Sequence, residues 1–281
     1  MPGEPSAIPF FLKVGQGQRF CLFHPPAGEC RGAVLYVHPF AEELNRSRRM
    51  AALQSRALAA LGYGVLQIDL YGCGDSSGDF GDARWDLWKQ DLAAGAAWLS
   101  QRLDRPVALW GLRLGALLAL DYAHTAPDPV AAMILWQPVL NGSSYLTQFL
   151  RLRVANTMLG EAAQQSGTGA MRAMLQAGET IEIAGYDLAP ELALAIDGLD
   201  APEAMAPRPG CPVHWFEALG PSSQSLPAGA VRVSNDWRGR GVSLQMQALQ
   251  CPPFWTTAEI TECPAWIDAT SAALQECAHA V

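Results

Sequence analysis

The stretch WGLRLG, residues 110–115, joins a predicted strand to a predicted helix. Gly111 and Gly115 stand two positions on either side of Arg113. Small residues at these positions let the strand and the helix approach closely. The central residue takes a strained backbone conformation, which costs about 1–3 kcal/mol in a residue other than glycine. The pattern therefore predicts a sharp turn that lifts the Arg113 side chain above the edge of a sheet.

Apolar runs alternate with helical patterns on both sides of this turn. Runs such as AVLYVH (33–38) and VAAMILWQ (130–137) are typical of strands buried on both faces. Strand–helix alternation produces a mostly parallel sheet covered by helices on both faces, so we expect an α/β fold. After an opening antiparallel pair, the predicted strands are 33–38, 64–70, 106–110, 130–137, 213–218 and 242–249. The predicted helices are 47–61, 83–103, 114–124, 228–238 and 260–277.

The alternation stops between residues 138 and 209. Here we predict a helix at 144–159, a short strand at 180–184 and a helix at 190–196, with no strongly buried strand. We therefore expect a single domain spanning residues 1–281, with a helical cap inserted at about 138–209.

Three features in chain order make the sequence resemble the α/β-hydrolase superfamily. HPF (38–40) follows the third predicted strand, DLYGCGDS (69–76) follows the fourth, and the turn at 110–115 follows the fifth. The resemblance implies a G-x-S-x-G turn with a nucleophilic serine, whereas this chain carries Arg113 at that position. It also implies backbone N–H donors to an oxyanion at Phe40 and Leu114.

The segment HPFAEELNRSRRM (38–50) is similar to the exosortase A system-associated hydrolases of type 2. Segments 110–116, 145–154, 181–196 and 252–255 carry the same resemblance. That family occurs in bacteria that make PEP-CTERM proteins and the associated exopolysaccharide. The resemblance implies this setting, a hydrolase acting on an ester or thioester, and a protein partner from the exosortase or exopolysaccharide system.

Composition excludes several classes of partner. The chain has 19 Lys and Arg against 27 Asp and Glu, a formal net charge of −8, and nucleic-acid binding depends on cationic contacts to phosphate. We therefore expect no nucleic-acid partner. Seven scattered cysteines without a C-x-x-C pair and five isolated histidines predict reduced thiols in the cytoplasm, with no metal and no cofactor. We predict no signal peptide and no transmembrane segment, which needs ~20 apolar residues.

A serine-type catalytic triad is incomplete in the sequence. Arg113 cannot act as a nucleophile, because guanidinium stays protonated at any working pH. The base should follow the last strand, yet no histidine stands between Val242 and Cys277, and His279 is third from the end. Glu217 is the candidate acid, but it would have no imidazole to orient.

Two interpretations of Arg113 carry equal weight. In the first, its guanidinium and the N–H groups of Phe40 and Leu114 form a pocket for a carboxylate, phosphate or sulfate. In the second, Arg113 forms an internal ion pair and fills the site. The candidate partners for that pair are Glu42, Glu43 and Glu217.

Aromatic residues are expected around the carboxyl-terminal edge of the sheet, where open α/β sheets bind ligands. Trp136, Phe254 and Trp255 suit an acyl chain or a sugar face, and packing between cap and core explains them equally well. A nearby cationic cluster either steers an anionic or polysaccharide ligand or pairs on a solvated face. Its members are Arg46, Arg48 and Arg49.

Three functions stay open at this point. The first is a hydrolase or acyl-transfer enzyme that uses Arg113 with Glu42 or Glu43. The second is a catalytically silent protein that binds a small anionic or acyl ligand. The third is a scaffold whose cap docks another protein.

Overall fold

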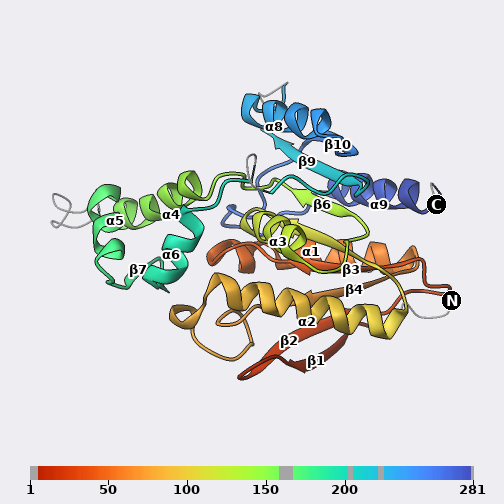
Figure 1. Cartoon of the computed structure of the whole chain (residues 1–281), viewed down its shortest axis with the longest axis horizontal. Coiled ribbons are helices and arrows are strands. Elements are labelled where there is room, and N and C mark those ends of the chain that lie inside the picture. The colour runs from red at the N-terminus through yellow and green to blue at the C-terminus, as the bar shows by residue number, and fades with distance from the viewer. Residues whose placement is uncertain (1–5, 158–166, 202–204, 221–224, 280–281) are drawn as a thin grey trace.

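Eight strands form one sheet in the computed structural model, which describes residues 6–157, 167–201, 205–220 and 225–279 (Figure 1). The strand order is β1-β2-β4-β3-β5-β6-β9-β10. The antiparallel pairs in this sheet are those of β2 (Gln18–His24), which pairs with β1 (Ile8–Lys13) and with β4. The parallel strands are β3 (Gly32–Val37), β4 (Tyr63–Ile68), β5 (Val107–Leu112), β6 (Met133–Trp136), β9 (Val213–Leu219) and β10 (Leu244–Gln250).

Helices cover both faces of the sheet, as its alternating side chains require. In β3, Leu35 and Val37 belong to the core formed with α2 (Trp85–Leu103) and α3 (Leu114–Thr125). Val34 and Tyr36 belong to the opposite core, with α1 (Glu42–Ala60) and α9 (Pro264–His279). A further helix, α8 (Ala228–Gly239), packs on the same face of the sheet as α2 and α3. The predicted fold class, a mostly parallel sheet between two helical layers, is confirmed.

The chain between β6 and β9 leaves the sheet and forms a separate group of elements, here called the insertion. It comprises α4 (Gly142–Thr157), α5 (Thr168–Gln176), the short hairpin β7 (Ile181–Ile183) and β8 (Tyr186–Leu188), and α6 (Pro190–Asp197). In Figure 1 the insertion lies at the opposite end of the molecule from the N and C labels. Phe40 packs on Phe149 of α4 with ring centroids 4.9 Å apart, which fixes the insertion against the sheet.

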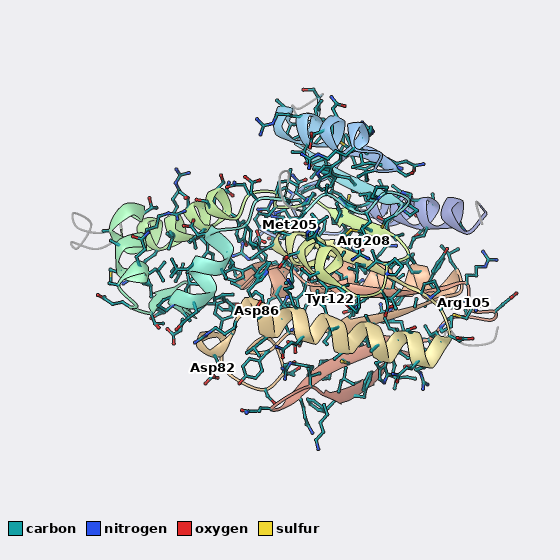
Figure 2. The ribbon with its side chains drawn as sticks, viewed as in Figure 1. Asp82, Asp86, Arg105, Tyr122, Met205 and Arg208 are labelled. Atoms are coloured by element: carbon teal, nitrogen blue, oxygen red, sulfur yellow. The ribbon has the colours of Figure 1, made fainter. Side chains whose placement is uncertain are left out.

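Helix α2 runs away from the insertion along the sheet. Figure 2 shows Asp86 at the end nearer the insertion and Arg105 beyond the other end. Asp86 in the first turn and Arg102 in the last turn complement the helix dipole. The helix begins close to the 3-10 turn η1 (Phe80–Asp82). None of the helices within the described ranges is long and apolar enough to cross a membrane.

Several elements differ from the predicted ones. Helix α1 begins at Glu42 instead of residue 47, because Glu42 and Glu43 suit the positive end of a helix dipole. Helix α9 begins at Pro264 instead of residue 260, and proline favours the first helical position. The prediction omitted α5 and β8. The strand predicted at 180–184 is one arm of a hairpin that turns at Ala184 and Gly185, both with positive φ.

The turn between β5 and α3 is as tight as its glycines predict. A Cβ atom on Gly115 would lie 2.4 Å from the carbonyl oxygens of both Val37 and His38. A Cβ atom on Gly111 would lie 2.4 Å from Cα of Ala116. Backbone, rather than movable side chain, therefore surrounds both positions.

We expect Gly115→Ala to lower the free energy of unfolding by about 2–3 kcal/mol, because the added methyl group forces α3 away from the end of β3. Gly229→Ala in α8 is the matched control, since nothing lies within 4 Å of a Cβ there and alanine favours the helix. Urea denaturation measures the free energy of unfolding of both variants. Equal stability of the two variants would contradict the steric argument.

Candidate functional site

Arg113 lies at the turn that joins β5 to α3, with φ 56° and ψ −120°. Its N–H donates to the Trp136 carbonyl at 2.9 Å, which ties the turn to the end of β6. Its carbonyl accepts from Ala116 N–H at 3.0 Å and from Val139 N–H at 3.1 Å. These three bonds hold a rare conformation for a residue with a side chain and direct that side chain toward the insertion side of the sheet.

The Arg113 guanidinium pairs with a carboxylate from α1. Its Nε lies 3.3 Å from Oε1 of Glu43, and the two side chains are 17% and 11% exposed. The Tyr145 hydroxyl, from α4 of the insertion, donates to the second oxygen of Glu43 at 3.3 Å. The guanidinium carbon also lies 5.5 Å from the ring centroid of Trp255 and 5.7 Å from that of Tyr145. A cation, a carboxylate and two aromatic rings thus meet where the insertion covers the turn.

Of the acidic residues considered, Glu43 is the one that reaches Arg113. Glu42 lies one residue earlier on the helix and pairs with Arg46 instead, with 3.8 Å between Oε2 and Nη2. Burial raises the pKa of Glu43, while Arg113 and the Tyr145 hydroxyl lower it. Burial, then the Glu43 carboxylate, raises the pKa of Tyr145, so its hydroxyl stays protonated and acts as a donor.

Glu217 is buried in β9 and is already satisfied by its neighbours. Its carboxylate accepts from the Trp215 indole N–H and from Nε2 of Gln137, both at 2.7 Å. Oε1 of Gln137 accepts from Ala218 N–H at 2.6 Å. Burial raises the pKa of Glu217, and these hydrogen bonds and the nearby Arg113 lower it. Glu217 therefore helps join β6 to β9 beside the turn and orients no imidazole among these partners.

Two backbone donors predicted from the resemblance face one small cavity. Phe40 and Leu114 both line it, and among the described residues neither N–H has an acceptor. The cavity measures about 10 Å³, roughly the space that one water molecule needs. An acyl chain does not fit there without movement of the surrounding side chains.

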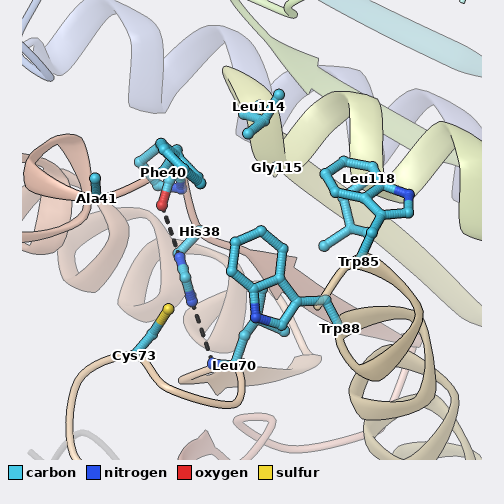
Figure 3. Close-up of a pocket in the computed structure, with 11 residues that line it drawn as sticks. His38, Phe40, Ala41, Leu70, Cys73, Trp85, Trp88, Leu114, Gly115 and Leu118 are labelled. Carbon is cyan, nitrogen blue, oxygen red and sulfur yellow. Dashed lines mark hydrogen bonds between the residues drawn. The ribbon is translucent and has the colours of Figure 1, made fainter. Parts of the chain in front are cut away.

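The loop that carries Phe40 is held by a buried histidine. His38 Nδ1 lies 2.7 Å from the Pro39 carbonyl, and Nε2 accepts from Leu70 N–H at 3.2 Å (Figure 3). These partners assign the proton to Nδ1 and leave the ring neutral. Burial lowers the pKa of His38. Its role here is to fix the loop between β3 and α1.

The aromatic residues divide between the site and the core. Trp255 lies over Arg113, but Trp136 and Phe254, expected to ring a ligand pocket, are fully buried on the α9 face. The Trp136 indole donates to Thr270 Oγ1 at 3.0 Å, and its ring packs 4.7 Å from Trp110. The reason is the strand's alternation, which turns the last side chain of β6 toward α9 instead of toward the insertion.

Two residues of this site were absent from the predicted set. Tyr145 carried a weak signal, a phenol beside Leu146, Phe149 and Leu150 on the buried face of its helix. Gln137 carried another, a polar residue closing the apolar run at 130–136. The contacts of Arg113 supply a carboxylate, a phenol and an indole, and this set lacks both a nucleophile and an imidazole base. In the described part of the chain, no group of three His, Cys, Asp or Glu residues is arranged to hold a metal ion.

This sheet, with its tight strand–helix turn and its insertion after β6, defines an α/β-hydrolase. A family model, serine aminopeptidase S33, matches residues 28–184, and the chain belongs to that family. The resemblance to the α/β-hydrolase superfamily is thereby confirmed. No curated protein matches the sequence.

Solved structures with the same fold include esterases and lipases. Est1E from Butyrivibrio proteoclasticus, with ferulic acid bound, has a TM-score of 0.65 at 15% identity, covering 95% of this chain and 98% of that one. A carboxyl esterase from Bacillus coagulans has a TM-score of 0.65 at 14% identity, and the match covers 97% of this chain and 99% of that one. A soluble variant of monoglyceride lipase from Saccharomyces cerevisiae has a TM-score of 0.63 at 14% identity, and the match covers 98% of this chain and 97% of that one. At such identities the likeness concerns the fold alone.

We expect Arg113→Met to lower the free energy of unfolding by about 2 kcal/mol, because Glu43 is left largely buried without its cation. Adding Glu43→Gln should restore more than half of that loss. Arg240→Met is the control, since its pair with Asp236 at the end of α8 is exposed on both sides and costs under about 0.5 kcal/mol. Additive effects of the two site substitutions, measured by chemical denaturation, would contradict a coupled pair.

The His38 imidazole predicts a pH dependence. Its pKa in the folded protein lies below its ordinary value of 6.5, so its contribution to stability is complete above that pH and is lost as pH falls through the lowered pKa. The free energy of unfolding should therefore fall less between pH 7.5 and pH 5 in His38→Asn than in the unaltered protein. Urea midpoints at the two pH values test this, and parallel pH profiles would refute it.

Proposed function

We propose that this chain is a catalytically silent α/β-hydrolase homologue that binds a small anion at Arg113. Arg113 takes the position at which the superfamily carries its nucleophilic serine. The observation that supports binding is that the guanidinium is only partly hydrogen-bonded. Nε pairs with Glu43, while among the described residues the two terminal nitrogens have no hydrogen-bond acceptor.

The ligand class follows from the donors at the turn. A guanidinium binds carboxylate, phosphate or sulfate through two parallel hydrogen bonds. The N–H groups of Phe40 and Leu114 add donors at the start of α3, where anions are favoured. Glu43 occupies part of this site, so the ligand competes with an internal carboxylate for the same cation.

The proposed setting rests on the resemblance to the exosortase A system-associated hydrolases, carried by segments 38–50 and 110–116. In this proposal the protein acts beside PEP-CTERM protein and exopolysaccharide assembly, in the cytoplasm. None of the cysteines whose side chains the structure describes forms a disulfide, as is usual for that compartment. We further propose that the chain is one domain with a cap at about 138–209, and that a protein partner of the system docks on the cap.

A second candidate function is hydrolysis of an ester or thioester at the same turn. Glu43 favours it, because a carboxylate with a raised pKa beside a guanidinium and a phenol can accept a proton from water. In that reaction Glu43 is the base, and Arg113 stabilises the developing oxyanion.

The test combines binding with turnover. We expect acetate, phosphate or sulfate to bind in isothermal titration, and Arg113→Gln to weaken that binding at least tenfold, with circular dichroism confirming that the variant is folded. Arg240→Gln, at the end of α8 outside the site, is the matched control and should bind like the unaltered protein. We also expect no labelling by a fluorophosphonate probe and no cleavage of p-nitrophenyl esters or acyl thioesters.

Two results would overturn the silent-homologue proposal. Anion binding that survives Arg113→Gln removes the binding role. Ester or thioester turnover that Glu43→Gln abolishes establishes the second function instead.

A further inference from the structure

A second hollow lies beside the Arg113 site, at the seam between the sheet and the insertion. This seam cleft encloses about 370 Å³, within the range of small-molecule sites. Four segments form it: the start of α1, the loop at 72–75 after β4, Phe80 of η1, and Tyr186 at the start of β8. Ala41 and Cys73 line both this cleft and the small cavity at the turn, so the two are neighbours.

One wall of the cleft is held in place by an ion pair. Arg48 lies 3.3 and 3.4 Å from the two oxygens of Asp69, and its Nε donates to Oδ1 of Asn45 at 3.4 Å. Asp69 also accepts from Asp75 N–H at 3.1 Å. A Cβ atom on Gly74 would lie 1.9 Å from Oδ2 of Asp69, so the loop can take this path only with glycine there. These contacts hold Arg48, Asp69 and the backbone of the loop in place before any ligand arrives.

Three polar groups in the cleft have no hydrogen-bond partner among the described residues. They are the Tyr186 hydroxyl, Nδ2 of Asn45 and the Asp75 carboxylate. The first donates and accepts, the second only donates, and the third only accepts. A ligand that satisfies all three must itself both donate and accept, as hydroxyl groups do.

An aromatic surface completes the cleft. The rings of Phe80 and Tyr186 meet edge to face with centroids 5.0 Å apart, and both line the cleft. Leu44 adds a further apolar contact from α1. Such a surface packs against the C–H face of a ring, while polar groups bind the hydroxyls at its rim. We infer that the seam cleft binds a neutral carbohydrate unit.

Other ligand classes fit less well. An anion would meet the Asp75 carboxylate, and the charge of Arg48 is already paired with Asp69. The charges near the Tyr186 phenol are of both signs, Glu42 with Arg46 and Arg48, so they give an anion no distinct advantage there. A metal ion lacks a set of ligands, since no three acidic, His or Cys side chains cluster in the described residues. This inference goes beyond the function proposed for Arg113. The two proposals are independent, and separate measurements test them.

Binding is tested with a fixed panel of probes, using saturation-transfer NMR and isothermal titration on the full chain. The panel is D-glucose, D-galactose, D-mannose and N-acetyl-D-glucosamine, with glucuronate and glucose 6-phosphate as charged counterparts. We expect at least one neutral sugar to bind, more tightly than its charged counterpart. Tyr186→Phe, which removes only the hydroxyl, and Asn45→Ala should each weaken that binding at least fivefold.

Two controls separate this site from its surroundings. Glu182→Ala alters an exposed residue of the same hairpin outside the cleft and should leave sugar binding unchanged. Arg113→Gln should also leave it unchanged, which distinguishes this site from the anion site. The inference is overturned if no neutral sugar binds, if binding survives both Tyr186→Phe and Asn45→Ala, or if the sugar phosphate binds best.

Discussion

The arrangement of this molecule depends on how closely the start of α3 approaches the end of β3. Gly115 leaves no room for a side chain between that helix and the carbonyl oxygens of Val37 and His38. This contact brings the Phe40 loop, the first turn of α1 and the Arg113 turn together at one edge of the sheet. Arg113, the Phe40 loop and Glu43, which follows that loop in sequence, reach their positions through that approach.

A guanidinium at this turn changes what the fold can do. In a serine hydrolase the turn presents a neutral hydroxyl, and the nearby donors act on charge that develops during reaction. Here a full positive charge is present at all times, and a carboxylate from α1 accompanies it. Taking both charges out of water is costly unless they remain paired, so the pair also resists rearrangement. This permanent charge is the basis of the anion binding proposed for Arg113.

Local sequence patterns predict the sheet, its helical layers and the turn because each depends on neighbours in the chain. The ion-pair partner of Arg113 could not be identified from these local patterns. Glu42 and Glu43 differ by about 100° around a helix whose start was predicted five residues too late, so the sequence did not separate them. Trp136 and Phe254 illustrate a related limit, since their direction depends on strand register and on α9. Tyr145 belongs to the insertion, whose contacts with the sheet are entirely long-range.

The bond from Tyr145 to Glu43 has a thermodynamic consequence. It connects a helix of the insertion to the carboxylate that accompanies Arg113. If the proposed anion displaces Glu43 from the guanidinium and from Tyr145, anion binding at the turn and the position of the insertion are thermodynamically linked. Linkage of this kind is reciprocal. A macromolecule that binds the insertion in its present position would then lower the affinity of the turn for the proposed anion by the same factor.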